Sequence, residues 1–108
     1  MSNLKKDPEL RRGYKDKEHL KKVAQLPCSL CFFLGEKQTT RTAVHHLHGE
    51  GIGKKSSDKL VMSLCDFHHQ TGKFAFHNMA KKDFENKYNI DQHGLIAITN
   101  KMIEKIFQ

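Results

Sequence analysis

The chain has 108 residues, a formal net charge of +7 and a sequence pI of about 9.4. A chain this short fits one domain with a thin core, which an added staple such as a metal would strengthen. The excess of lysine and arginine favours a polyanionic partner, because phosphate contacts release counterions. No long apolar run occurs in the sequence, so we expect no membrane partner.

Three cysteines, an odd number, argue against a closed framework of disulfides. Residues 1–8 are polar and lack the apolar stretch of a secretory signal. We therefore expect a cytoplasmic protein, in whose reducing surroundings thiols stay free to bind metal.

Apolar spacing and breaker residues predict a basic arm over residues 1–14 and a single domain over residues 15–108. Pro27 ends the first helix, and Asp91 is placed to N-cap the last one. The elements expected in chain order are a helix over 15–26, a turn over 28–35, a strand over 39–47, a loop over 48–58, a short apolar run over 60–64, a helix over 74–88 and a helix from 91 to 106. This mixture predicts an α+β fold.

Two pairs of residues have the spacing of metal ligands: Cys28-x-x-Cys31 and Cys65-x-x-His68. Three thiolates and one imidazole match a closed, tetrahedral structural zinc site, which would staple the thin core. Two alternatives stay open. The first pair could be a redox motif, although that motif normally lies in a βαβ context, and His69 could replace His68 as the fourth ligand.

Four of the eight histidines form the doublets His45-His46 and His68-His69. Hydrolysis of a phosphodiester needs a base that accepts a proton from water and a divalent cation at the phosphate oxygens. Adjacent residues on a strand point to opposite faces. A distorted strand end would let one histidine of the first doublet bind a metal while the other faces the water.

Asp58 and His77 are further candidate ligands of such a cation. A carboxylate is a hard ligand suited to Mg²⁺, and the expected helix over 74–88 would carry His77 on the same face as Ala80 and Phe84. The structural alternatives are that Asp58 caps a turn and that His77 packs against a backbone partner. A lone His48 in a loop with glycines is expected to be solvated.

Together these motifs resemble the HNH (ββα-metal) endonuclease superfamily, and more narrowly the phage and prophage recombination-enhancement (Ref-like, RecA-dependent) nucleases. The resemblance covers about residues 20–90. The motifs that carry it are Cys28-x-x-Cys31, His45-His46-Leu47, Gly51-Ile52-Gly53-Lys54, Asp58-Lys59-Leu60, Leu64-Cys65-Asp66-Phe67-His68-His69 and Ala75-Phe76-His77.

The resemblance implies a small zinc-stapled ββα-metal core with flanking helices, in which two strands and a helix clasp one catalytic cation, Mg²⁺ or another divalent ion. It implies that His46 is the general base. It also implies that His45, Asp58 and His77 surround the cation and that Lys54 contacts DNA phosphates.

The sequence departs from the common pattern of that superfamily at two positions. Asp58 stands where asparagine is usual, and His68 replaces a fourth cysteine. In those proteins a histidine directly follows the last zinc ligand, so His69 competes with His77 for the third place at the catalytic cation.

The sequence thus predicts a metal-dependent DNA endonuclease of the phage recombination or repair type, acting in the cytoplasm of a bacterial host. Its expected partners are DNA and, as a candidate, a RecA-type recombinase filament. The alternative is a non-catalytic zinc-containing module that binds DNA or a recombinase. Such a module does not need the His45-His46 doublet or Asp58.

Overall fold

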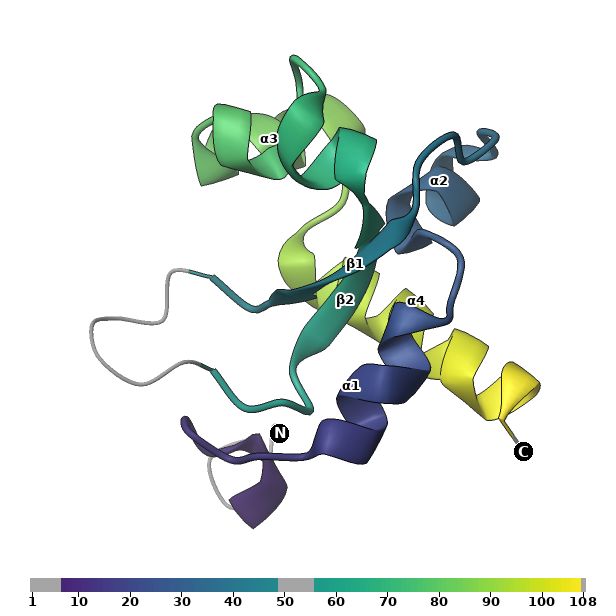
Figure 1. Ribbon diagram of the computed structural model, residues 1–108. Coiled ribbons are helices and arrows are strands. Elements are labelled where there is room, and N and C mark those ends of the chain that lie inside the picture. Colours follow the sequence, from purple (N-terminus) through teal and green to yellow (C-terminus); the bar gives the residue numbers. More distant parts are fainter. Residues whose placement is uncertain (1–6, 49–55, 108) are drawn as a thin grey trace.

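The computed structural model describes residues 7–48 and 56–107, and these form an α+β protein, as the sequence predicts. Figure 1 shows its two strands crossing at the centre of the molecule, with helices around them. The elements in chain order are the 3-10 helix η1 (Pro8–Leu10), α1 (Lys17–Ala24), α2 (Ser29–Leu34), β1 (Thr42–His46), β2 (Val61–Cys65), the π-helical turn η2 (Phe67–Thr71), the 3-10 helix η3 (Phe76–Asn78), α3 (Lys81–Tyr88) and α4 (Gln92–Ile106).

The sheet consists of β1 and β2, which pair in antiparallel fashion with His45 opposite Met62 and His46 opposite Val61. Every residue of β2 is buried. In β1, His45 is buried and His46 is half-buried, because successive side chains of a strand point to opposite faces. The regular alternation of the strand therefore separates the two histidines of this doublet, and the distorted strand end that the sequence suggested is not needed for it.

Helices α1, α2 and α4 pack against β2 and so bury it. Two buried hydroxyl groups tie these helices to the strand. The Ser63 N–H donates to Thr99 Oγ1 of α4 at 3.2 Å, and Ser29 Oγ of α2 donates to the Ser63 carbonyl at 2.7 Å. The largest fully buried side chains are Phe84, Leu26, Leu30, Met62, Leu64 and Leu95.

The prediction of a single helix over residues 74–88 is wrong, because η3 and α3 are separate helices. Met79 and Ala80 are extended between them, with ψ of 156° and 143°. The Asn78 side chain donates to the carbonyls of Gln70 and Gly72 at 2.7 and 2.8 Å, which ties η3 to the preceding turn. Side chains of this type compete with helical hydrogen bonding, and the break takes His77 off α3.

Two helix ends show how local chemistry sets the boundaries. The expected turn over residues 28–35 contains the short helix α2, which begins after Cys28 and ends at Gly35 in the left-handed conformation with φ 69°. The expected N-cap of the last helix is confirmed, since Asp91 Oδ1 accepts from the Gly94 N–H at 2.8 Å. None of the described helices is long and apolar enough to cross a membrane.

Candidate metal centres

The first candidate centre is a buried group that could hold a metal ion such as zinc. Its members are Cys28, Cys31, Cys65 and His68, whose ligand atoms all lie within 4.8 Å of one another. Cys28 precedes α2 and Cys31 lies in its first turn, while Cys65 ends β2 and His68 lies in η2. The fold thus brings the two expected half-sites together, with His68 as the fourth member.

The distances within this Cys₃His group match a tetrahedral zinc site. Usual Zn–S and Zn–N bond lengths imply edges of about 3.8 Å between two sulfurs and about 3.6 Å between sulfur and nitrogen. The Sγ atoms of Cys31 and Cys65 are 3.8 Å apart. The Nδ1 atom of His68 lies 3.5 Å from Cys31 Sγ, 3.3 Å from Cys65 Sγ and 3.9 Å from Cys28 Sγ. Four donors therefore converge, whereas a redox pair would need only two thiols.

The electrostatics of the Cys₃His group also suit a cation. Burial raises the pKa of the Cys28 and Cys31 thiols, and for Cys31 the neighbouring thiols raise it further. A divalent cation would supply the charge that stabilises their thiolate forms. Burial lowers the pKa of His68, opposed by Glu36, whose Oε1 lies 3.8 Å from His68 Nε2. This exposed carboxylate lies nearest to Nε2, the ring nitrogen other than the one that faces the thiols, at a distance longer than a hydrogen bond.

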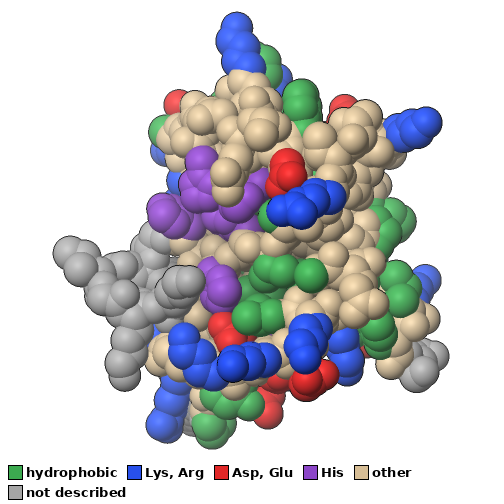
Figure 2. Space-filling view, viewed as in Figure 1, with side chains coloured by type: hydrophobic (Ala, Val, Ile, Leu, Met, Phe, Trp, Pro, Cys, Tyr) green, Lys and Arg blue, Asp and Glu red, His purple; other side chains and the backbone are tan. Residues whose placement is uncertain are grey.

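The second candidate centre consists of His45, His69 and His77, contributed by β1, η2 and η3 respectively. The Nε2 atom of His69 lies 3.0 Å from His45 Nδ1 and 3.0 Å from His77 Nε2. Ligands about 2.1 Å from a cation and at right angles are about 3.0 Å apart. Two of the rings are buried and that of His77 is exposed. Figure 2 shows histidine side chains gathered in a patch on one face of the molecule.

The buried rings of this three-histidine cluster are held in the neutral form that a metal requires. Burial, together with the neighbouring His69 and His77, lowers the pKa of His45 to about 3. Burial, followed by the effect of His77, also lowers the pKa of His69. In addition, His45 Nε2 is buried without a hydrogen-bond partner among the described residues. Buried imidazoles with strongly lowered pKa values and an unpartnered nitrogen lower the stability of the fold, and are more typical of a functional site than of a packing core.

The turn η2 divides the second histidine doublet between the two centres. His68 faces the thiols and His69 faces His45 and His77, although the two are neighbours in sequence. The sequence left open which of His69 and His77 completes the second centre, and the structure brings both into it. A π-helical turn, common at functional sites, gave no recognisable signal in the sequence.

The expected ligand set of His45, Asp58 and His77 differs from the cluster in the structure, because Asp58 lies outside it. Both of its carboxylate oxygens have other partners. Oδ1 lies 2.8 Å from His46 Nε2, and Oδ2 accepts from the Asp16 N–H at 2.8 Å. Burial acts to raise the pKa of Asp58, but the hydrogen bonds from His46 and Asp16 outweigh it and hold the pKa below its usual value.

A residue that the sequence analysis took as solvated lies beside the three-histidine cluster. The ring of His48 is exposed, and its centroid lies 6.3 Å from that of His45 and 6.2 Å from that of His77. The only indication in the sequence that His48 lies beside the cluster is the number of histidines in this stretch of the chain. Lys54, expected at DNA phosphates, lies outside the described residues.

Comparisons with known proteins add no family to this picture. The chain matches no protein-family model, no curated protein and no solved structure. What the protein does is therefore inferred from its two candidate metal centres and the residues around them.

Proposed function

We propose that the protein is a metal-dependent DNA endonuclease of the HNH type, with a structural zinc ion in the Cys₃His group and a second divalent cation in the three-histidine cluster. One observation carries this proposal: three imidazoles converge beside the surface, separate from a closed four-ligand group. Structural zinc sites have all four positions filled by protein, whereas catalytic metal sites keep positions open for water and substrate.

The donors of the three-histidine cluster indicate which cation it takes. All of them are imidazole nitrogens, and no carboxylate of the described residues joins them. Imidazole suits Zn²⁺, Ni²⁺ and related transition metals, whereas Mg²⁺ prefers oxygen ligands. We therefore favour a transition metal over Mg²⁺ as the second cation. When bound, it would supply Lewis-acid polarisation of a phosphoryl oxygen and a lowered pKa for water.

His46 is the proposed general base. Because Asp58 is an ionised acceptor 2.8 Å from His46 Nε2, the neutral form of His46 would carry its ring proton on Nε2 and a lone pair on Nδ1. The side chain of His46 is 22% exposed, so water can reach it. In hydrolysis His46 would accept a proton from the attacking water, and Asp58 would keep the ring in the required tautomer.

The charge of the chain supports an anionic substrate. A net charge of +7 attracts a phosphodiester backbone. The rival function, a zinc module that binds DNA or a recombinase without catalysis, would share this charge and the Cys₃His group. It would have no use for the convergence of His45, His69 and His77, and for this reason we prefer the nuclease.

The test is strand cleavage by the purified, zinc-containing full chain. Supercoiled plasmid and single-stranded DNA would be incubated with Mn²⁺, Co²⁺, Ni²⁺ or Mg²⁺, with and without a recombinase filament. We expect cleavage with a transition metal and a loss of about 10² to 10⁴ in rate for His46→Ala, the usual effect of removing a general base. His45→Ala should instead lose the second cation.

A matched control is His93→Ala, because His93 is exposed and lines a separate hollow between α1 and α4. It should cleave like the wild type. DNA binding without cleavage under every condition, by a chain that holds both metals, would favour the zinc-module function. Equal rates for His46→Ala and the wild type would remove His46 from the mechanism.

A further inference from the structure

His48 is held in place by one buried side chain. Gln92, the first residue of α4, is only 3% exposed. Its Oε1 accepts from the His48 N–H at 2.8 Å, and its Nε2 donates to the His48 carbonyl at 3.0 Å. The amide thus satisfies both backbone groups of one residue, much as a neighbouring strand would.

The contact is not a helix cap. Asp91 already provides the side-chain cap of α4, so Gln92 is free of that task. A solvated histidine in a loop, such as His48, needs no anchor. A buried amide such as that of Gln92, by contrast, must have its hydrogen bonds satisfied. Gln92 therefore fixes the backbone from which the exposed His48 ring extends.

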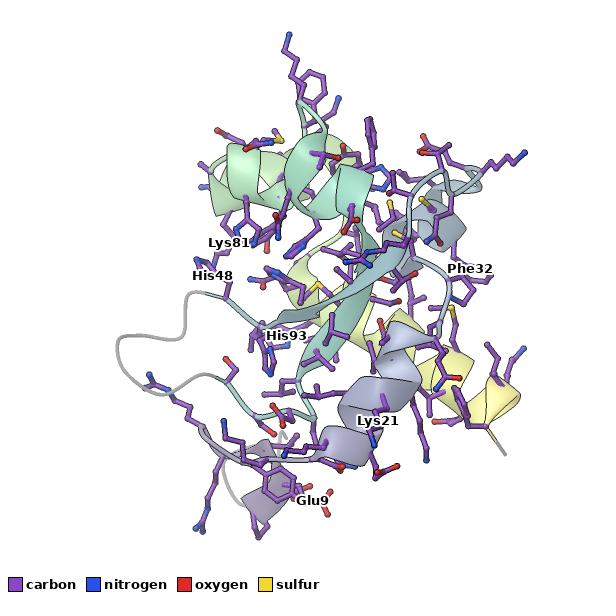
Figure 3. All side chains as sticks on the ribbon, in the orientation of Figure 1. Glu9, Lys21, Phe32, His48, Lys81 and His93 are labelled. Atoms are coloured by element: carbon purple, nitrogen blue, oxygen red, sulfur yellow. The ribbon has the colours of Figure 1, made fainter. Side chains whose placement is uncertain are left out.

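The ring of His48 lies beside the three-histidine cluster without belonging to its group of ligand atoms. It is absent from the group of ligand atoms within 4.8 Å of one another. Its centroid is about 6 Å from the rings of both His45 and His77, and it packs edge-on against the buried Phe76 at 5.7 Å. Figure 3 labels His48 at the margin of the molecule, just before the grey trace begins.

We propose that His48, positioned by Gln92, is a phosphate-binding residue: an imidazole N–H donates a hydrogen bond to a non-bridging oxygen of the phosphodiester. This inference rests on the proposed function and adds to it a residue for substrate recognition. A phosphate has several oxygens and can contact the cluster with one and His48 with another. Neutral and protonated imidazole both carry an N–H donor, so the contact does not depend on the charge of the ring.

The first test measures binding and is independent of cleavage. The full chain, with zinc in the Cys₃His group and Co²⁺ in the three-histidine cluster, is titrated with inorganic phosphate while the Co²⁺ absorption spectrum is recorded. We expect His48→Ala to weaken phosphate binding about tenfold or more, the effect of losing a hydrogen bond to a charged group. Its content of both metals should equal that of the wild type.

Two further variants separate recognition from a structural effect. His48→Asn restores an N–H donor and should recover part of the phosphate affinity. Gln92→Met removes the anchor while leaving His48 in the chain, and should weaken phosphate binding with unchanged metal content. The control is again His93→Ala, which should bind phosphate like the wild type.

The second test is cleavage of single-stranded DNA by the same variants. If His48→Ala binds phosphate more weakly than the wild type, but the wild type itself cleaves no DNA, the phosphate site would be supported and the nuclease function overturned. Cleavage and phosphate binding at wild-type levels in His48→Ala would overturn the role of His48 and leave the nuclease standing. Loss of Co²⁺ from His48→Ala, or no phosphate binding by the wild type, would also overturn the proposed role of His48.

Discussion

Replacing His68 should weaken zinc binding, whereas replacing its neighbour His69 should leave zinc binding unchanged. His68→Ala removes one of four zinc ligands, whereas His69→Ala leaves the Cys₃His group complete. Zinc binding contributes about 10 to 16 kcal/mol in small zinc domains, so an even share is about 3 kcal/mol for each ligand. Because a domain of about 100 residues loses about 4 to 8 °C in Tm per kcal/mol, His68→Ala should melt about 12 to 24 °C lower.

The assay combines elemental analysis with thermal unfolding. Both variants and the wild type are dialysed against a weak chelator, their zinc per chain is measured, and Tm is followed by circular dichroism. A third variant, His68→Cys, supplies a fourth thiolate and should retain zinc and most of the stability of the wild type. His69→Ala should keep its zinc and lose only the cation of the three-histidine cluster.

The result that would refute this reasoning is equal zinc loss in both alanine variants. It would mean that η2 does not divide the two histidines between separate centres. Full zinc retention and an unchanged Tm in His68→Ala would show that the three cysteines hold the ion without His68. Failure of His68→Cys to bind zinc would show that an imidazole is required at this position.

Two other predictions concern pH and packing. The pKa of His45 falls from 6.5 in the unfolded chain to about 3 in the fold, so below pH 6.5 the unfolded state binds the extra proton and stability is lost as the pH falls toward 3. Urea unfolding would be measured before a cation is added to the three-histidine cluster. Between pH 6.5 and 5.5 the unfolding free energy of the wild type should fall by about 1 kcal/mol more than that of His45→Asn. Equal losses would contradict the lowered pKa of His45. At Gly72, a Cβ would lie 2.5 Å from the Phe67 carbonyl oxygen that closes η2. Gly72→Ala should therefore cost about 1 to 3 kcal/mol in unfolding free energy, and a wild-type value would show that the turn yields freely.

Local spacing in the sequence predicted what depends on neighbours in the chain. The N-cap at Asp91 and the two cysteine half-sites are motifs a few residues long, and the α+β class follows from the run of such local patterns along the chain. Spacing predicted His68 as the fourth member of the Cys₃His group with His69 as the alternative, and the π-helical shape of η2 directs His68, rather than His69, toward the thiols.

Contacts between distant segments account for what the sequence did not predict. Asp58 has the chemistry of a metal ligand, yet its second oxygen is occupied by the N–H of Asp16, 42 residues away. A repeat of four along residues 74–88 is compatible with one helix, yet Asn78 bonds to backbone carbonyls outside that segment and breaks it. The place of His48 depends on Gln92, 44 residues later. Such pairings are invisible to spacing along the chain.

The sharing of one short turn by the two candidate metal centres couples the filling of one to the filling of the other. Zinc in the Cys₃His group would hold His68, and with it the turn η2 that directs His69 toward His45 and His77. On the proposed function, zinc would then bind first and the second cation would bind to a finished fold. If the protein is the proposed nuclease, a cell short of zinc would accumulate inert chains rather than partly active ones, so the supply of one metal would control a reaction that depends on another.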